Sequence, residues 1–135
     1  MSASARPAGP RVLIVDDDTE AREILAIALR TIGGATVETL DNPLAALQRM
    51  NHTRVDVLVT DIGMSGMSGL DLLHMLRESG CWPIHGALVI SGENDPELPR
   101  RALACGAGRF FSKPFSAWAV RKAVISLLEG RNGAG

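Results

Sequence analysis

Three short, largely apolar runs in this chain each stop at an acidic or hydroxyl residue. The runs span residues 12–15, 55–60 and 87–90, and the residues that follow them are Asp16, Asp61 and Ser91. Apolar runs without strict alternation are typical of strands that are buried on both faces of a parallel sheet. A parallel sheet covered by helices on both faces is therefore the predicted architecture. Weaker strand patterns at residues 36–40 and 109–112 bring the expected number of strands to five.

Segments with helical periodicity separate the expected strands. We expect five helices, which begin near residues 20, 43, 69, 97 and 117. The first of them, over residues 20–32, has apolar residues at helical spacing, and these are Ala21, Ile24, Leu25, Ala28, Leu29 and Ile32. Strands that alternate with helices indicate right-handed βαβ units on one parallel sheet, hence an α/β fold.

Local signals mark several of the helix ends. Asp18, Ser68 and Ser116 are expected to cap the first, third and fifth helices, because short polar side chains accept hydrogen bonds from free backbone amides. In the second helix, which opens at Asn42-Pro43, the expected inner residues are Leu44, Leu47 and Met50. In the third helix the expected inner residues are Leu70, Leu73 and Leu76, and in the fifth they are Val120, Val124, Leu127 and Leu128.

Length and composition limit the classes of protein that the chain can belong to. With 135 residues, one domain is expected, and we assign it to residues 11–129, between a flexible leader (1–10) and a flexible tail (130–135). A formal net charge of −1 argues against direct binding of nucleic acid, which needs a basic surface. The sequence shows neither an apolar run long enough for a membrane span nor a signal peptide. We therefore expect a cytoplasmic protein, with Cys81 and Cys105 as free thiols.

Polar side chains with a shared chemistry follow the expected strands. Asp16 and Asp17 follow the first strand, Asp61 the third, Ser91 the fourth and Lys113 the fifth. In an open α/β sheet the ligand crevice lies beyond the carboxyl ends of the strands, so these side chains are expected to converge there. Two carboxylates about 4 Å apart repel each other by roughly 4 kcal/mol at an effective dielectric near 20. Three carboxylates therefore call for a cation, and oxygen ligands beside a crevice suit Mg²⁺.

This set of residues favours phosphoryl chemistry. An aspartate can attack phosphorus as a nucleophile and form an acyl phosphate. Phosphoryl transfer mainly requires positioning and charge neutralisation, which Mg²⁺ and Lys113 can supply, and the Ser91 hydroxyl can donate a hydrogen bond to a phosphoryl oxygen. Taken singly, an aspartate after a strand is more often a helix cap than a functional residue. Only the combination of these residues at separate strand ends indicates a site.

Four stretches resemble the receiver domains of two-component response regulators. VLIVDDD resembles their opening, VDVLVTDIGMSGMSGLDLL their phosphoacceptor strand and loop, ALVISGEN their fourth strand and CGAGRFFSKPF their last strand. The resemblance covers residues 11–129 and is of the chemotaxis-receiver type. It implies a flavodoxin-like (βα)5 fold, with a doubly wound parallel sheet of five strands in the order 2-1-3-4-5.

The resemblance also implies a role for each residue of the site. Asp61 would accept a phosphoryl group from a histidine of a sensor kinase or a histidine phosphotransfer protein. Asp17 and Asp61 would bind Mg²⁺ directly together with the Gly63 carbonyl, and Asp16 would act through a water molecule. Ser91 and Lys113 would contact the phosphoryl group.

Ser91 has a second implied role, in switching. It would move toward the phosphoryl group and so make room for Phe110 to rotate, which would change the surface of the fourth helix, fifth strand and fifth helix for a downstream protein partner. The resemblance also implies a cis Lys113-Pro114 bond and allows a homodimer through the fourth and fifth helices. Such a protein is a phosphoacceptor switch that promotes its own phosphorylation and dephosphorylation, and is not an enzyme acting on another substrate.

Two other functions remain open at this point. A pseudo-receiver would use the same fold to bind a partner without phosphate, and the complete acidic set argues against it. A phosphatase of the haloacid-dehalogenase type needs Thr or Val at the fifth position of its Asp-x-Asp motif, where this chain has Glu20. Departures from the receiver pattern are Ser65, where a proline is usual, and Gly63 and Glu93, which leave the rate of autodephosphorylation open. The sequence is compatible with a stand-alone receiver and with one taken from a longer protein, and it names no kinase, target or stimulus.

Overall fold

A five-stranded parallel sheet forms the centre of the computed structural model, which describes residues 9–130. The strands are β1 (Arg11–Val15), β2 (Thr36–Leu40), β3 (Val57–Asp61), β4 (Gly86–Ser91) and β5 (Arg109–Ser112). Their order in the sheet is β2-β1-β3-β4-β5, and every neighbouring pair is parallel. This is the flavodoxin-like order that was predicted from the resemblance.

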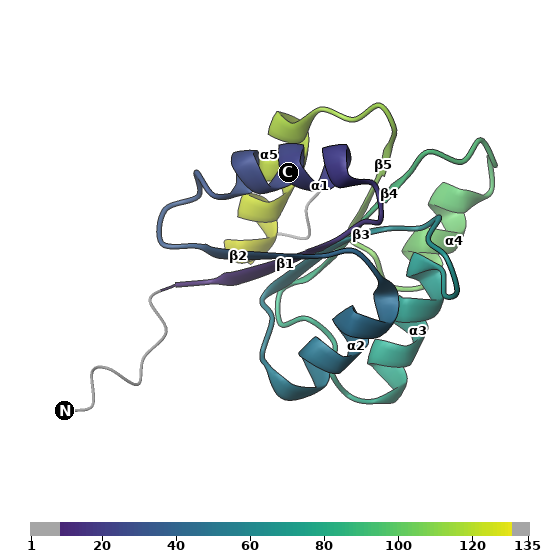
Figure 1. The fold of residues 1–135 in the computed structure, drawn as a ribbon, viewed down its shortest axis with the longest axis horizontal. Helices are drawn as coiled ribbons and strands as arrows, with labels where there is room; N and C mark the ends of the chain where they lie inside the picture. The colour runs from purple at the N-terminus through teal and green to yellow at the C-terminus, as the bar shows by residue number, and fades with distance from the viewer. Residues whose placement is uncertain (1–8, 131–135) are drawn as a thin grey trace.

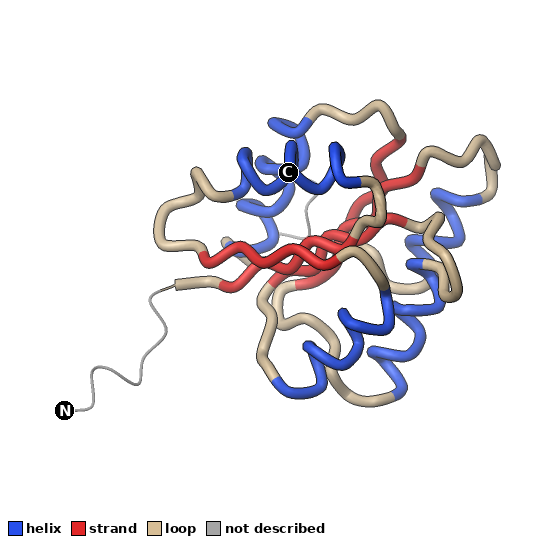
Figure 2. Tube along the Cα trace, in the orientation of Figure 1, coloured by secondary structure: helices blue, strands red, loops and turns tan. Residues whose placement is uncertain are grey.

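Helices cover both faces of the sheet (Figure 1). They are α1 (Thr19–Leu29), α2 (Pro43–His52), α3 (Gly69–Glu78), α4 (Leu98–Ala104) and α5 (Ala117–Leu128). α1 and α5 lie on one face, whereas α2, α3 and α4 lie on the other, and Figure 2 shows how helix and strand alternate along the chain. No helix within residues 9–130 has the length and apolar character needed to cross a membrane.

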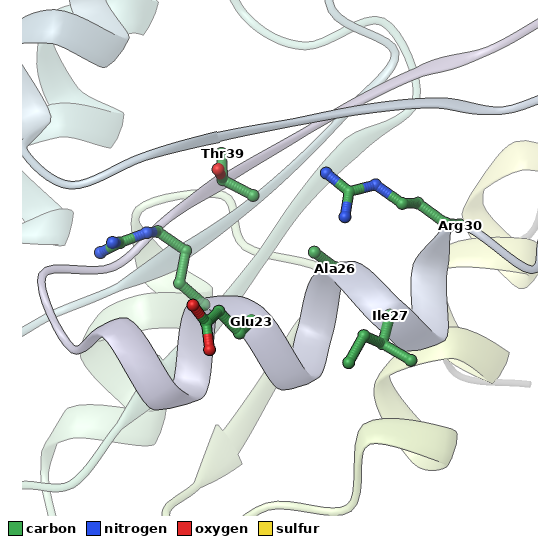
Figure 3. Close-up of a pocket in the computed structure, with 6 residues that line it drawn as sticks. Glu23, Ala26, Ile27, Arg30 and Thr39 are labelled. Atoms are coloured by element: carbon green, nitrogen blue, oxygen red, sulfur yellow. The ribbon is translucent and has the colours of Figure 1, made fainter.

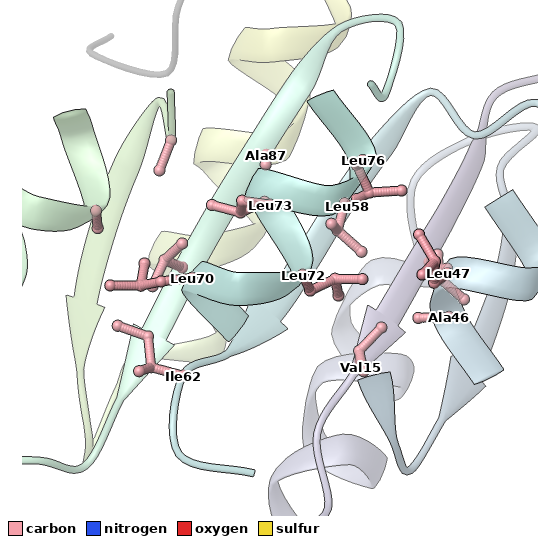
Figure 4. Packing of buried hydrophobic residues seen from close by; sticks show 14 of the residues in the cluster. Val15, Ala46, Leu47, Leu58, Ile62, Leu70, Leu72, Leu73, Leu76 and Ala87 are labelled. Carbon is pink, nitrogen blue, oxygen red and sulfur yellow. The ribbon is translucent and has the colours of Figure 1, made fainter. Parts of the chain in front are cut away.

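Each face of the sheet carries its own apolar core. On one side, leucines of α3 pack with Leu58 of β3 and with Ala46 and Leu47 of α2 (Figure 4). On the other side, Leu25 and Leu29 of α1 and several residues of α5 pack against β1, β3 and β4. Because both faces are covered, β1, β3 and β4 are buried along almost their whole length and are largely apolar, which explains the apolar runs in the sequence.

The predicted helix caps are present. Asp18 accepts a hydrogen bond from the Glu20 amide, Ser68 forms a capping box with Asp71, and Ser116 caps α5. Asn42 caps α2, which has Pro43 at its first position. By contrast, α4 has no side-chain cap and only seven residues, so its first turn depends on packing of Leu98.

Some predicted inner faces are wrong in detail. Ile24 and Leu44, both expected to be buried, are 45% and 56% exposed. In their helices the small side chains of Ala26 and Ala46 are buried instead. Leu128 is only half-buried, at the end of α5. The strand expected at 55–60 begins two residues later and includes Asp61.

Most of the predicted leader and tail lies outside the described residues. Residues 9 and 10 are described, and the Pro10 carbonyl accepts a hydrogen bond from the Thr36 amide (2.8 Å). A Cβ on Gly9 would lie 2.2 Å from the Gly34 carbonyl oxygen. These backbone contacts of residues 9 and 10 extend the pairing of β1 with β2 toward the N-terminus.

Candidate functional site

The carboxyl ends of β1, β3 and β5 bring three carboxylates and one ammonium group together. Asp16 follows β1 directly, Asp61 is the last residue of β3, and Lys113 follows β5 directly. Carboxylate oxygens of Asp16, Asp17 and Asp61 lie within 4.8 Å of one another. The convergence that was predicted from the strand ends is therefore present in the fold.

Backbone hydrogen bonds hold the acidic loop in place. The Asp16 amide donates to the Leu40 carbonyl (3.1 Å), which ties the end of β1 to β2. Asp16 Oδ1 accepts from the Asp18 amide (2.9 Å), and the Asp16 carbonyl accepts from the Arg22 guanidinium (2.7 Å). This role of Arg22 was not predictable from the sequence, because an arginine in the first turn of a helix gives no signal of what it contacts.

Lys113 is the counter-charge inside the cluster. Its Nζ lies 3.2 Å from Asp16 Oδ2 and 3.4 Å from Asp61 Oδ1, and the two carboxylates are almost fully buried. The Lys113 amide donates to the Ser91 carbonyl (2.8 Å), which fixes the lysine to the end of β4. The bond that follows, Lys113-Pro114, is cis, as the resemblance implied.

The electrostatic balance of the cluster favours a further cation. Burial, followed by the charge of Asp16, raises the pKa of Asp61 to about 6, although Lys113 acts in the opposite direction. The pKa of Lys113 is raised by Asp61 and Asp16, against the effect of burial. One ammonium group thus faces three carboxylates, and a single positive charge leaves the group electrostatically unsatisfied.

The donor set fits Mg²⁺. All three side chains supply carboxylate oxygens, the ligand type that Mg²⁺ prefers, and Asp17 is exposed, so the cluster is open to solvent and to a second ligand. Within residues 9–130, the buried Asp16 Oδ2 has no hydrogen-bond donor of suitable geometry, and its only close partner is the ammonium group. Asp16, Asp17 and Asp61 could therefore hold a divalent ion.

The remaining predicted site residues lie on β4, on β5 and in the loop after β3. Ser91 is buried at the end of β4, where its Oγ accepts a hydrogen bond from the Glu93 amide (3.0 Å). Phe110 is half-buried in β5, in register with Val89, and packs against the core on the α3 side. Gly63 lies two residues after Asp61, in the loop that leads to α3.

Two glycines beside Asp61 have neighbours that the sequence did not reveal. A Cβ on Gly63 would lie 2.9 Å from Glu93 Oε2, so the Glu93 carboxylate occupies the space beside Gly63. A Cβ on Gly69, the first residue of α3, would lie 2.1 Å from the Asp61 carbonyl oxygen. The only signal for the second contact was a glycine directly after the Ser68 cap, where a better helix former is expected.

The ionisation of Asp61 leads to a first prediction, for the protein without metal. An Asp61→Asn variant is expected to match the wild type in unfolding free energy near pH 4 and to exceed it at pH 7. The folded-state pKa of Asp61 is about 6, above its ordinary value, so the wild type loses stability as pH rises from about 4 to about 6. The loss is at most about 3 kcal/mol.

Urea unfolding in EDTA across this pH range measures the effect. The difference between variant and wild type should grow with pH and level off above the folded-state pKa. If the unfolding free energies of the two proteins changed with pH in parallel, ionisation of Asp61 would not destabilise the folded state.

Known proteins share both the fold and much of the sequence of this chain. The family model of the response regulator receiver domain matches residues 12–125. The chemotaxis protein CheY of Pseudomonas aeruginosa is 30% identical over 123 residues, which cover 91% of this chain and 99% of that protein. The response regulator TodT of Pseudomonas putida is 36% identical over 105 residues, which cover 77% of this chain and 44% of that protein.

Solved structures agree with these matches. The signal receiver domain of the putative response regulator NarL from Mycobacterium tuberculosis superposes with a TM-score of 0.80 and 30% identity. The alignment covers 93% of this chain and all of that one. A receiver domain of a Francisella response regulator also gives a TM-score of 0.80, at 25% identity.

Proposed function

The chain belongs to the response regulator receiver family, and we propose from this premise that Asp61 accepts a phosphoryl group from a phosphohistidine of a partner protein. An Asp61 carboxylate oxygen attacks phosphorus, the P–N bond breaks, and the imidazole leaves with its electron pair and takes up a proton. The observation that supports the proposal is the convergence of Asp16, Asp17 and Asp61 around Lys113.

Each residue of the site has a proposed part in this reaction. Asp17 and Asp61 would hold Mg²⁺ together with the Gly63 carbonyl, and Asp16 would act through a water molecule. The bound ion would supply positive charge to the phosphoryl oxygens. Lys113 neutralises the same charge from the protein side, and the Ser91 hydroxyl donates a hydrogen bond to the phosphoryl group.

Switching is proposed to begin at Ser91. In the unphosphorylated protein its Oγ accepts from the Glu93 amide, and a phosphoryl group on Asp61 would compete for this residue. Phe110 lies one strand away and is only half-buried, so a displaced Ser91 would let its ring move inward. The population would shift toward a second arrangement of α4, β5 and α5, the surface offered to a downstream partner.

The proposed partners follow from the phosphoryl donor and the switch. They are a sensor histidine kinase or a histidine phosphotransfer protein on the input side and a protein target on the output side, all in the cytoplasm. No direct contact with nucleic acid or with a membrane is proposed. A homodimer through α4 and α5 stays a prediction. The protein would act as a phosphoacceptor switch and not as an enzyme on another substrate.

Incubation with acetyl phosphate tests the proposal without a kinase. We expect the intact mass to increase by one phosphoryl group when Mg²⁺ is present, and to stay unchanged in EDTA or in the Asp61→Asn variant. An independent reading comes from thermal unfolding, in which Mg²⁺ should stabilise the unphosphorylated wild type more than this variant. An unmodified Asp61 in folded, Mg²⁺-saturated protein would support the pseudo-receiver instead, and turnover of p-nitrophenyl phosphate would support a phosphatase.

Glu93 is expected to control the lifetime of the acyl phosphate. Its carboxylate lies beside Gly63, two residues from Asp61, where it can accept a hydrogen bond from a water molecule that attacks phosphorus. A Glu93→Ala variant should therefore lose phosphate more slowly, by roughly 10-fold to 100-fold if Glu93 acts as a general base. Release of phosphate from isolated phosphoprotein measures the rate.

Glu97→Ala is the matched control, because Glu97 pairs with the exposed Arg100 at the start of α4 and lies outside the acidic cluster. An unchanged half-life in Glu93→Ala would mean that water reaches the phosphoryl group without this carboxylate.

A further inference from the structure

The outward face of α1 exposes an apolar centre. Ile27 and Trp118 are the most exposed large hydrophobic side chains among the described residues, at 69% and 65%, and Ile24 is 45% exposed. Ile24 and Ile27 belong to α1, and Trp118 belongs to the neighbouring helix α5. Arg121 of α5 stacks on the Trp118 ring, 4.6 Å from its centroid, and donates to Thr31 just after α1 (2.7 Å). Arg121 therefore links the Trp118 ring to the end of α1.

Ile27 lies between an acidic residue and a basic residue on α1. Glu23 lies four residues before it and Arg30 three residues after it, and all three residues are exposed. Residues i, i+4 and i+7 lie along one side of a helix. Among residues 9–130, neither Glu23 nor Arg30 forms an ion pair. An acid, an isoleucine and a base thus succeed one another along the helix, and both charges are available to a second molecule.

The order of charges along α1 is complementary to that of a second α1 helix that runs in the opposite direction. In an isologous dimer, residue i of one copy contacts residue j of the other and residue j contacts residue i. An antiparallel pair of α1 helices that matches Glu23 with Arg30 places Ile27 opposite Ala26 of the second copy. The same register forms two ion pairs and brings both isoleucines to the centre.

A groove lies where this register needs one. The groove opens between α1 and Thr39 of β2, and its volume is about 330 Å³ (Figure 3). Four of the residues of α1 that line it are Glu23, Ala26, Ile27 and Arg30. These four residues stand at positions i, i+3, i+4 and i+7, the set that forms the hole for a knob side chain in packed helices. Ala26 has the smallest side chain of the four, so the groove has room for Ile27 of the second copy.

We propose that two copies of this chain associate through antiparallel α1 helices, with Ile27 of each copy in the groove of the other and with Glu23 paired with Arg30. One helix pair corresponds to the small, weak class of interfaces, so the dimer forms at protein concentrations on the order of 100 µM. The contact uses none of the residues of the acidic cluster and does not depend on phosphorylation.

Charge reversal tests the register. Sedimentation velocity over a concentration series should show dimers for the wild type and a loss of association of at least about 10-fold for Glu23→Arg and for Arg30→Glu alone. An equimolar mixture of the two single variants, and the double variant, should associate again, because both place opposite charges face to face. A general loss of folding cannot produce this rescue. Failure of both the mixture and the double variant to associate would overturn the proposed register.

Ile27→Glu tests the apolar centre, and Leu103→Glu on α4 is the matched control, because Leu103 is also exposed (52%). Ile27→Glu should abolish the dimer and Leu103→Glu should leave it intact. If Leu103→Glu abolishes the dimer and Ile27→Glu does not, the contact surface is α4 and the proposal is overturned. A wild type that stays monomeric at about 500 µM also overturns it. Both variants should still take phosphate from acetyl phosphate, so the result is independent of the proposed function.

Discussion

Replacement of Lys113 by Met is expected to lower the rate of phosphorylation by acetyl phosphate about 100-fold or more. Removal of a group that stabilises charge in the transition state typically costs this much. Lys113 Nζ lies 3.4 Å from Asp61 Oδ1, at the position where the negative oxygens of an incoming phosphoryl group would gather. Met has a similar length and keeps the apolar part of the side chain, so the change isolates the charge.

The same variant is expected to bind Mg²⁺ more tightly than the wild type. Without Lys113, the three carboxylates lose the ammonium group that pairs with Asp16 and Asp61, and mutual repulsion makes a divalent ion more favourable. A fall in phosphorylation rate combined with a rise in Mg²⁺ affinity separates a role of the lysine in charge stabilisation from a general loss of the site. Thermal unfolding with and without Mg²⁺ measures the affinity change.

Lys122→Met is the control for Lys113→Met, because Lys122 is exposed on α5 and takes no part in the acidic cluster. A Lys113→Arg variant should not restore the rate, because the planar guanidinium is larger than an ammonium group and presents its donors in a fixed geometry. Normal phosphorylation of Lys113→Met at saturating Mg²⁺ would show that the metal alone neutralises the phosphoryl group.

The sequence was sufficient to predict the parallel sheet and the residues at the strand ends, and the resemblance to receiver domains gave the strand order. Strands buried on both faces are largely apolar, so their approximate positions were visible without any knowledge of contacts. The polar residues that interrupt these runs are Asp16, Asp61 and Ser91, and parallel strands bring such positions to one edge of the sheet. The convergence of the cluster was therefore a consequence of fold type and not of fine packing.

The orientation of the helices was less predictable. Ile24 and Leu44 fit the helical periodicity as well as any buried residue, yet both are exposed. The inner positions belong to Ala26 and Ala46, because a helix can approach the sheet more closely where its side chains are small. Periodicity predicts that a helix has an apolar face. The rotation of the helix about its axis depends on the size of the side chains and on the shape of the sheet.

Close contacts around the site were much less predictable. The contact of the Glu93 carboxylate with the space beside Gly63 leaves no pattern in the sequence, and the only signal for the approach of Gly69 to the Asp61 carbonyl was a glycine directly after the Ser68 cap. The first depends on how the loops after β3 and β4 lie relative to each other, and the second on how the connection between β3 and α3 folds back on β3. The backbone approach at Gly69 requires glycine, but many glycines in a chain serve turns instead, as Gly66 does with its φ of 87°.

Gly69→Ala is expected to be among the most damaging single substitutions near the site. The new Cβ would lie 2.1 Å from the Asp61 carbonyl oxygen and 3.1 Å from the Ile62 Cα. Both neighbours are backbone atoms, so neither can rotate away. The loop after β3 must move, at a cost of about 3 kcal/mol in unfolding free energy. Because the clash is with the Asp61 carbonyl itself, the Asp61 carboxylate should also move away from Asp16 and Lys113.

Gly33→Ala provides the matched control, since no heavy atom lies within 4 Å of the position that its Cβ would occupy and its φ is not positive. Alanine has a higher helix propensity than glycine. If Gly69 made no close contact, Gly69→Ala at the first position of α3 would therefore be neutral or slightly stabilising. The sign of the change in unfolding free energy therefore decides whether the contact with Asp61 dominates. Phosphorylation per folded molecule, measured well below the melting temperature, reports separately on the displacement of Asp61. A stable, fully active Gly69→Ala protein would mean that the β3–α3 loop can shift without disturbing the acidic cluster.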